Sequence, residues 1–303
     1  ATAAARLGLR TGLVAGFGDD AYADWMWHTM AHEEGIDLSA SRRFADFHSA
    51  LTVSIAAEGD RAMATHGHDL PEPLSSLIAR APHARAAVVD LAGETSWWAQ
   101  LAQRGSLVFA DIGFDETGRW DPSDLAPLTH CHAFTPNALE AMAYTRTDSP
   151  DRAVRALAEM VPLAVVTDGA SGSYAIDSST GEEAYCPAVP VTAIDTTGAG
   201  DVFAAAMVLG TLADWPLEER LRFGSLCSAL AVQQFGGSLA APGWGDITDW
   251  WRSLSAAADG GDLRAAYTRT GYRFLDDVVP DHPVQGRRRA QGTFALRSDA
   301  GQH

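Results

Sequence analysis

The sequence predicts an α/β fold in which a mostly parallel sheet is covered by helices on both faces. Two observations support this: short apolar runs typical of strands alternate with helical segments, and no repeat or evident linker interrupts that alternation. The chain has 303 residues, of which 47% are hydrophobic and 20% are charged, so it is long enough to bury a full core. Parallel strands are joined by helical crossovers, which is why this order of elements indicates a sheet with two covered faces.

The first elements follow from glycine positions and from the spacing of apolar residues. We expect a helix up to about Leu7, ended by Gly8, and then a strand near residues 11–15. A second helix fits residues 20–34, ended by Gly35. From Phe44 to Thr65 apolar and polar residues alternate around a Glu-Gly-Asp turn, which predicts a small antiparallel pair of strands set apart from the main sheet.

After this patch the alternation of strands and helices resumes. We expect strands at residues 86–89, 107–110, 133–134 and 163–167, helices at 96–104, from 137, at 199–213 and at 217–235, and a hairpin between 172 and 190. The aromatic residues Trp244, Trp250, Trp251, Tyr272 and Phe274 indicate a further helix and strand packed on the core. The last stretch, residues 285–303, carries four arginines and one aspartate and predicts a disordered tail.

Charge and composition exclude several classes of protein. The formal net charge of −17 argues against a nucleic-acid partner and against an anionic membrane surface, since both need clustered cations. All 22 basic residues are arginine, so the chain has no lysine for a Walker A loop or a Schiff base. The three cysteines are scattered, which favours a reducing, cytoplasmic location over a disulfide framework.

The strongest motif is the run from Asp195 to Asp201, Asp-Thr-Thr-Gly-Ala-Gly-Asp, which leads from a strand-like segment into an apolar helix. Glycines let backbone N–H groups approach a ligand closely, and the start of a helix attracts a phosphate. Asp201 would then stand beside the anion and accept a proton from a hydroxyl group. The alternative is that Asp201 only caps the helix and that the glycines form a turn.

This run resembles the C-terminal signature of the ribokinase-like (PfkB) carbohydrate kinases. The resemblance implies that Asp201 is the catalytic base and that Gly198, Ala199 and Gly200 form the anion hole for the transferred phosphate. It also implies the ribokinase-like fold over residues 1–284, with the alternating patch, approximately residues 40–66, as a β-lid over the sugar.

Two further motifs resemble the same family. Asn137 and Glu140 have the spacing of a capping box, and the resemblance implies that they help to hold Mg²⁺-bound phosphates of ATP. Thr167, Gly169 and Gly172 match a Thr-x-Gly-x-x-Gly pattern that lies against the nucleotide in the family. Without the resemblance these residues read as a helix start and an ordinary strand-to-turn pattern.

The late segment 232–242 resembles a family loop near the adenine and a monovalent cation. The resemblance implies a K⁺ site that includes Asp195 and Thr197, with Thr197 also at the phosphates. Lids of this kind often pair in the family, which would make a second copy of the chain a partner.

The resemblance begins after the family's first strand and its sugar-binding Gly-Gly segment. Two readings stay open: the sequence is an N-terminal truncation, or the protein lacks part of the substrate site. We therefore predict an ATP-dependent kinase that phosphorylates an alcohol group of a sugar, a sugar acid or a nucleoside. The alternative is a non-catalytic sugar or nucleotide sensor with the same fold.

Overall fold

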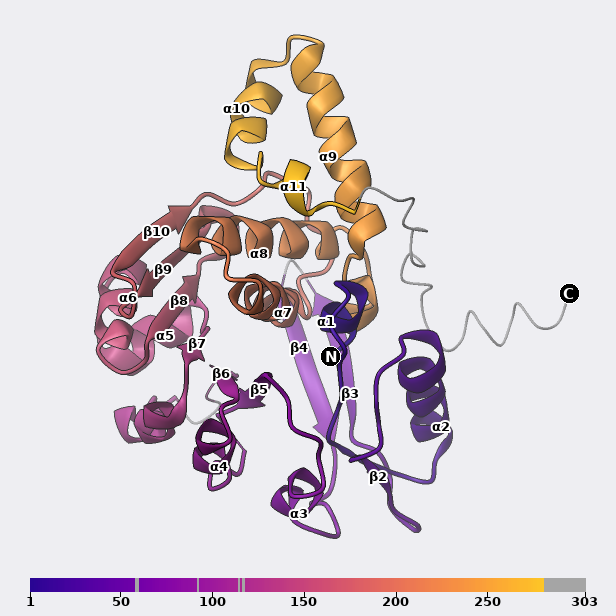
Figure 1. The fold of residues 1–303 in the computed structure, drawn as a ribbon. Helices are drawn as coiled ribbons and strands as arrows, with labels where there is room; N and C mark the ends of the chain where they lie inside the picture. The colour runs from indigo at the N-terminus through magenta and orange to yellow at the C-terminus, as the bar shows by residue number, and fades with distance from the viewer. Residues whose placement is uncertain (58–59, 92, 114, 116–117, 281–303) are drawn as a thin grey trace, which may run out of the picture. The chain divides into compact units, whose positions relative to one another are not determined.

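The computed structural model of the chain describes residues 1–57, 60–91, 93–113, 115 and 118–280 (Figure 1). The chain forms two compact units. One consists of residues 10–82 together with Ala1, and the other of residues 2–9 and the chain from residue 83 onward. The predicted tail, residues 285–303, lies outside the described residues.

The larger unit is built on a six-stranded sheet with the strand order β10-β9-β8-β7-β6-β5. Its strands are β5 (Ala86–Asp90), β6 (Leu107–Asp111), β7 (Ala133–Phe134), β8 (Leu163–Thr167), β9 (Ser173–Asp177) and β10 (Glu182–Cys186). Strands β5 to β8 run parallel, whereas β9 pairs antiparallel with both β8 and β10. The mostly parallel sheet predicted from the sequence is confirmed.

The helices of this unit connect the strands and follow them. They are α1 (Thr2–Arg6), α4 (Trp98–Gln103), α5 (Ala138–Thr145), α6 (Pro150–Ala158), α7 (Ala199–Leu212), α8 (Leu217–Ala231), α9 (Trp244–Asp259), α10 (Leu263–Gly271) and α11 (Leu275–Val278), with 3₁₀ turns at Pro122–His130, Gly169–Ser171 and Gly237–Ala240. No helix in the described ranges is both long enough and apolar enough to cross a membrane.

The central strands bury side chains on both faces of the sheet. In β8, Ala164 and Val166 pack into a core that contains side chains of α4, α5 and α6. The intervening residues Leu163 and Val165 pack into a second core, formed with α7 and α8. Figure 1 shows α7 and α8 running side by side. Four successive buried apolar residues, 163–166, are the pattern expected of a strand that helices cover on both faces.

The described chain after residue 243 consists of three helices joined by turns, without a strand. Helices α9 and α10 lie against each other, and α9 also packs on α8 (Figure 1). The predicted C-terminal helix is confirmed, but the predicted strand is wrong. Tyr272 follows α10 and Phe274 precedes α11, and the Leu275 N–H donates to the Tyr272 carbonyl at 3.0 Å. The backbone groups are thus paired within a helical turn, and the two aromatic rings reach the core from that turn.

The smaller unit contains the predicted antiparallel pair, β3 (Leu51–Ala57) and β4 (Asp60–His66). It also contains a parallel pair, β1 (Gly16–Phe17) and β2 (Arg42–Arg43), and the helices α2 (Ala21–His28) and α3 (Leu74–Ile78). A π-helical turn, Thr29–Glu33, extends α2, so the predicted helix over residues 20–34 is confirmed.

The strand predicted near residues 11–15 is wrong. In this segment only Gly12 forms an isolated bridge, with Asp37. The Asp37 N–H donates to the Thr11 carbonyl, and its carbonyl accepts from the Leu13 N–H. Both hydrogen bonds of this bridge are therefore made by one residue, Asp37. The paired strand β1 begins only at Gly16.

Candidate active site

The first turn of α7 leaves two backbone N–H groups without a partner. The Ala199 N–H donates to the Thr196 carbonyl at 3.2 Å, and the Val202 N–H donates to the Gly198 carbonyl at 3.0 Å. The N–H groups of Gly200 and Asp201, between them, donate to no other described residue. No side chain caps this helix. The turn therefore presents open donors together with the positive end of a 14-residue helix dipole.

The glycines around this turn differ in what their missing side chains would meet. Gly198 adopts a left-handed conformation with φ +77°, and a Cβ there would lie 3.3 Å from the carbonyl carbon of Gly237. The backbone of the late loop thus packs directly against Gly198. A Cβ on Gly200 would meet nothing within 4 Å. The close backbone of the late loop therefore explains why residue 198 is glycine. No such contact explains Gly200, which borders open space beside the free N–H groups.

The segment before α7 is held by short-range hydrogen bonds. The Thr197 N–H donates to Asp195 Oδ1 at 2.9 Å, which closes a turn. The N–H groups of Ile194 and Asp195 both donate to the Val232 carbonyl, at 2.7 and 3.1 Å. These bonds hold Ile194 and Asp195 against Val232, the first residue of the late segment 232–242, and the K⁺ site stays a prediction.

Asp201 lies exposed in the first turn of α7, and its carboxylate has no hydrogen bond or ion pair to any described residue. It is close enough to Asp111, at the end of β6, for its charge to raise the pKa of that carboxyl. The interpretation of Asp201 as a cap is not supported, because its carboxylate accepts no backbone N–H and no side chain caps α7.

Asp111 is a site residue that the sequence analysis missed. It ends β6 directly beside Asp90, its register partner at the end of β5. Burial raises the pKa of Asp111 to about 7, and the negative charges of Glu140, Asp201 and Asp90 add to the effect. Its position in the sequence could have identified Asp111, because it directly follows a predicted strand. Ligands of such sheets bind at the carboxyl ends of parallel strands.

Asn137 and Glu140 form the capping box at the start of α5. Asn137 Oδ1 accepts the Glu140 N–H at 3.0 Å, and Glu140 Oε2 accepts the Asn137 N–H at 2.9 Å. Burial raises the pKa of Glu140, and the hydrogen bond from the Asn137 N–H opposes that shift. The Asn137 side-chain amide donates to no residue in the described part of the chain. The capping role is thus present, and it leaves that amide available.

Thr167 lies next to this helix start, because it forms a bridge with Asn137 and its N–H donates to the Pro136 carbonyl at 3.2 Å. Beyond it, Gly169 has φ +48°, and a Cβ there would meet nothing within 4 Å. Gly172 has φ +111°, and a Cβ there would clash with the Cys186 carbonyl oxygen. Packing against the segment after β10 therefore requires Gly172, whereas Gly169 faces open space.

The family model described as pfkB family carbohydrate kinase matches residues 1–243 of the chain. The chain belongs to the pfkB family of carbohydrate kinases. The kinase is 31% identical over 268 residues to a fructokinase from Klebsiella pneumoniae, a match that covers 82% of this chain and 85% of that protein.

Solved structures share the fold. The structure of Arabidopsis thaliana ribokinase complexed with ribose and ATP has a TM-score of 0.70 at 22% identity, over 82% of this chain and 84% of that one. A putative ribokinase II from E. coli, in complex with ATP and Mg²⁺, has a TM-score of 0.68 at 18% identity, over 83% and 86%. The predicted ribokinase-like fold of the kinase is confirmed.

Replacing each of the two glycines after β8 tests which of them the packing of the fold requires. Gly172→Ala introduces a clash with the Cys186 carbonyl and strain at positive φ, so we expect it to lower the free energy of unfolding by more than about 2 kcal/mol. Gly169→Ala adds only left-handed strain, about 1 kcal/mol. Urea unfolding of both variants measures this difference, and equal losses would contradict the assignment.

Asp111 gives a pH-dependent prediction. Its pKa is about 7 in the folded kinase and close to 4 in an unfolded chain, so the folded state binds the extra proton between these values. Stability from this group is present at about pH 4 and is lost as the pH rises toward 7. Asp111→Asn cannot ionise, so we expect it to match the wild type near pH 4 and to exceed it by about 2–4 kcal/mol at pH 8.

Chemical unfolding of the two proteins in EDTA, without nucleotide, at several pH values measures this difference. Asp214→Asn is the matched control, since Asp214 is an exposed carboxylate just beyond the other end of α7. A constant difference between Asp111→Asn and the wild type at all pH values would show that Asp111 ionises normally.

Proposed function

We propose that this carbohydrate kinase transfers the γ-phosphate of ATP to an alcohol group of a sugar, a sugar acid or a nucleoside, with Asp201 as the general base. The observation that carries the proposal is the first turn of α7, where two unpartnered N–H groups adjoin an exposed, unpartnered carboxylate. Open donors suit a phosphoryl group, and a carboxylate beside them suits a hydroxyl that must lose its proton.

In this mechanism the acceptor hydroxyl gives its proton to Asp201 as its oxygen bonds to the γ-phosphorus. The bond between that phosphorus and the bridging oxygen of ADP breaks. The N–H groups of Gly200 and Asp201 donate to the transferring phosphoryl oxygens, while Gly198 and Ala199 fix the turn. Because the donors are already oriented, they stabilise the developing charge without rearranging.

Several residues at the carboxyl edge of the sheet have the chemistry needed for a nucleotide with Mg²⁺. Mg²⁺ prefers oxygen ligands, keeps several waters and binds through one or two carboxylates plus substrate phosphates, where it neutralises phosphate charge. The Glu140 carboxylate and the available Asn137 amide suit such a complex. No three acidic, histidine or cysteine side chains of the described ranges form a complete metal cage. Thr167 and Gly169 border the proposed nucleotide position, while Gly172 supports their turn.

We also propose that Asp195 and Thr197, with neighbouring backbone carbonyls, hold a monovalent cation such as K⁺. The side chains of Asp195 and Thr197 offer oxygen atoms as ligands, and the hydrogen bonds to the Val232 carbonyl hold their segment against the late segment.

The β3/β4 pair is proposed as the lid and as the contact between two copies of the chain. The described cysteines, Cys131, Cys186 and Cys227, are free and buried, which supports a reducing, cytoplasmic location.

The direct test of this function is ADP release from ATP and Mg²⁺ in the presence of single sugars, sugar acids and nucleosides. We expect acceptor-dependent ADP formation with at least one of them. If ATP binds but no acceptor of any of these classes releases ADP, the protein is the sensor instead.

Asp201→Asn keeps the size of the side chain but removes the base. We expect kcat to fall about 10²–10⁴-fold while the affinity for ATP stays unchanged. Asp214→Asn makes the same change of charge at the far end of α7 and should keep full activity. A turnover of Asp201→Asn near that of the wild type would remove Asp201 from the role of base.

Gly200→Val fills the open space beside the free N–H groups. Since a Cβ there meets nothing within 4 Å, we expect the variant to fold, to bind ATP poorly and to lose at least about 100-fold in kcat. Ser253→Val places the same side chain on an exposed position of α9 and serves as control. Unchanged ATP kinetics in Gly200→Val would contradict the anion hole.

A further inference from the structure

Arg6 is a buried arginine outside the candidate active site. It is the last residue of α1 and is 6% exposed, although a guanidinium group keeps its positive charge inside proteins. Its Nη1 atom donates to the Leu239 carbonyl at 2.8 Å and to the Ala241 carbonyl at 2.6 Å. Burial of a charge is costly unless polar groups bind it, so these two carbonyls are among the partners that stabilise Arg6 at this position.

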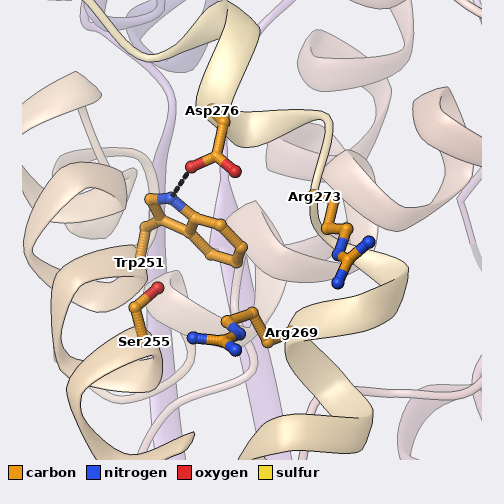
Figure 2. A pocket seen from close by; sticks show the side chains of 5 residues that line it. All are labelled: Trp251, Ser255, Arg269, Arg273 and Asp276. Atoms are coloured by element: carbon orange, nitrogen blue, oxygen red, sulfur yellow. Dashed lines mark hydrogen bonds between the residues drawn. The ribbon is translucent and has the colours of Figure 1, made fainter. Parts of the chain in front are cut away.

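Both carbonyls belong to the late segment 232–242, whose two ends are held by other contacts. At its start the Val232 carbonyl accepts the Asp195 N–H at 3.1 Å. Its end leads into α9, which packs in the same core as α1 and α7. Figure 2 shows a cavity of about 380 Å³ in this C-terminal part, where the Trp251 indole N–H of α9 donates to Asp276 Oδ1 at 2.9 Å. Arg6 binds the stretch between these two fixed ends.

That stretch has little rigidity of its own. It contains two successive glycines at positive φ, Gly236 at +124° and Gly237 at +52°. Glycine leaves the backbone many conformations, and the following 3₁₀ turn, Gly237–Ala240, is short. Arg6 donates to one carbonyl inside this turn and to the carbonyl directly after it. A planar guanidinium group that binds both carbonyls restricts the conformations open to the turn.

The same turn packs against the start of α7. A Cβ on Gly198 would lie 3.3 Å from the carbonyl carbon of Gly237, so the two backbones are in close contact. Arg6 is itself fixed relative to α7, because Ala3 and Leu7, on either side of it in the sequence, pack in the same core as α7. Arg6 thus connects the late segment to a helix that already packs with α7.

We propose that Arg6 is a positioning residue for phosphoryl transfer, which holds the late segment against Gly198 and thereby fixes the direction of the two open N–H groups that follow. In this role the guanidinium group touches no reacting atom and acts through the backbone that it binds. Donors held in one direction stabilise developing charge best, and a displacement of about 1 Å can cost about 100-fold in rate. The inference rests on the proposed function, because it concerns the same turn of α7.

Arg6→Lys tests this role, because it keeps the charge but replaces the planar guanidinium group by an ammonium group on a shorter side chain. We expect kcat for ADP release to fall about 10–100-fold while the KM for the acceptor stays unchanged, since the N–H groups act on the transferring phosphoryl group. Hydrogen exchange of residues 236–241, measured without substrate, should become faster in this variant.

Arg220→Lys is the matched control. Arg220 is also 6% exposed, but its guanidinium group pairs with Asp177 at 3.2 Å, between α8 and β9. We expect thermal unfolding to show a loss of stability in both lysine variants. The control should nevertheless keep the wild-type kcat and the wild-type hydrogen exchange over residues 236–241. A loss of stability alone would affect the two variants alike.

Arg6→Ala gives a second, independent measurement. It removes the guanidinium group from beside the two carbonyls, so that a free guanidinium ion can take its place. Guanidine hydrochloride, at concentrations well below those that unfold proteins, should restore part of kcat in Arg6→Ala and should not raise kcat of the wild type. If Arg6→Ala does not fold, the comparison of the two lysine variants decides.

The proposal is overturned if Arg6→Lys turns over as the wild type does, if both lysine variants lose kcat equally, or if hydrogen exchange of residues 236–241 is unchanged in Arg6→Lys. These outcomes leave the proposed function intact. A wild-type protein that binds ATP but releases no ADP with any acceptor would instead overturn the proposed function, and the role of Arg6 with it.

Discussion

The unpaired N–H groups at the start of α7 depend on a helix that has almost no freedom to move. Residues 202–208 of α7 are all buried. The Phe203 ring lies against Gly224 of α8, where a Cβ would come within 2.9 Å of it. The Ser228 hydroxyl donates to the Ala199 carbonyl at 2.8 Å, directly at the first turn. This packing fixes the direction of the first turn, so its open donors are oriented in advance, which is the condition for stabilising charge without reorganisation.

Several acidic side chains lie near the carboxyl ends of the parallel strands and the start of α7. Asp90, Asp111, Glu140 and Asp201 are near enough for their charges to act together, and burial adds to the cost of ionising Asp111 and Glu140. The chain has no lysine to balance them. We therefore expect the free protein to hold one of these carboxyls protonated near neutral pH. A cation that accompanied a nucleotide at this edge would lower the cost of ionising these carboxyls.

Much of the larger unit could be predicted from local sequence. The bounds of β8 are those expected from its apolar run, and α5 begins at the capping box of Asn137. These features depend on residues close together along the chain. The role of Asp111 could not be predicted this way, because its pKa depends on burial and on charges from α5 and α7. The distinction between Gly169 and Gly172 likewise depends on contacts made across the fold, since only Gly172 meets the backbone after β10.

The errors have a related physical cause. The segment at residues 11–15 has strand-like composition, but its backbone bonds to Asp37, to the Ser41 side chain and to Arg42 do not form a continuous ladder. Tyr272 and Phe274 alternate with polar residues as strand residues do. Their backbone N–H and carbonyl groups nevertheless form hydrogen bonds within helical turns rather than with a strand. Period-two spacing predicts a strand only where a partner strand is available, and that is decided by the tertiary fold.

The C-terminal helices share a core with α7, although the family match ends before them. Val202, the residue after Asp201, belongs to the same apolar cluster as Phe223, Trp251 and Tyr272. Trp251 of α9 thus packs in the same core as the first turns of α7. Loss of packing at Trp251 would therefore also weaken the core that supports the first turn of α7.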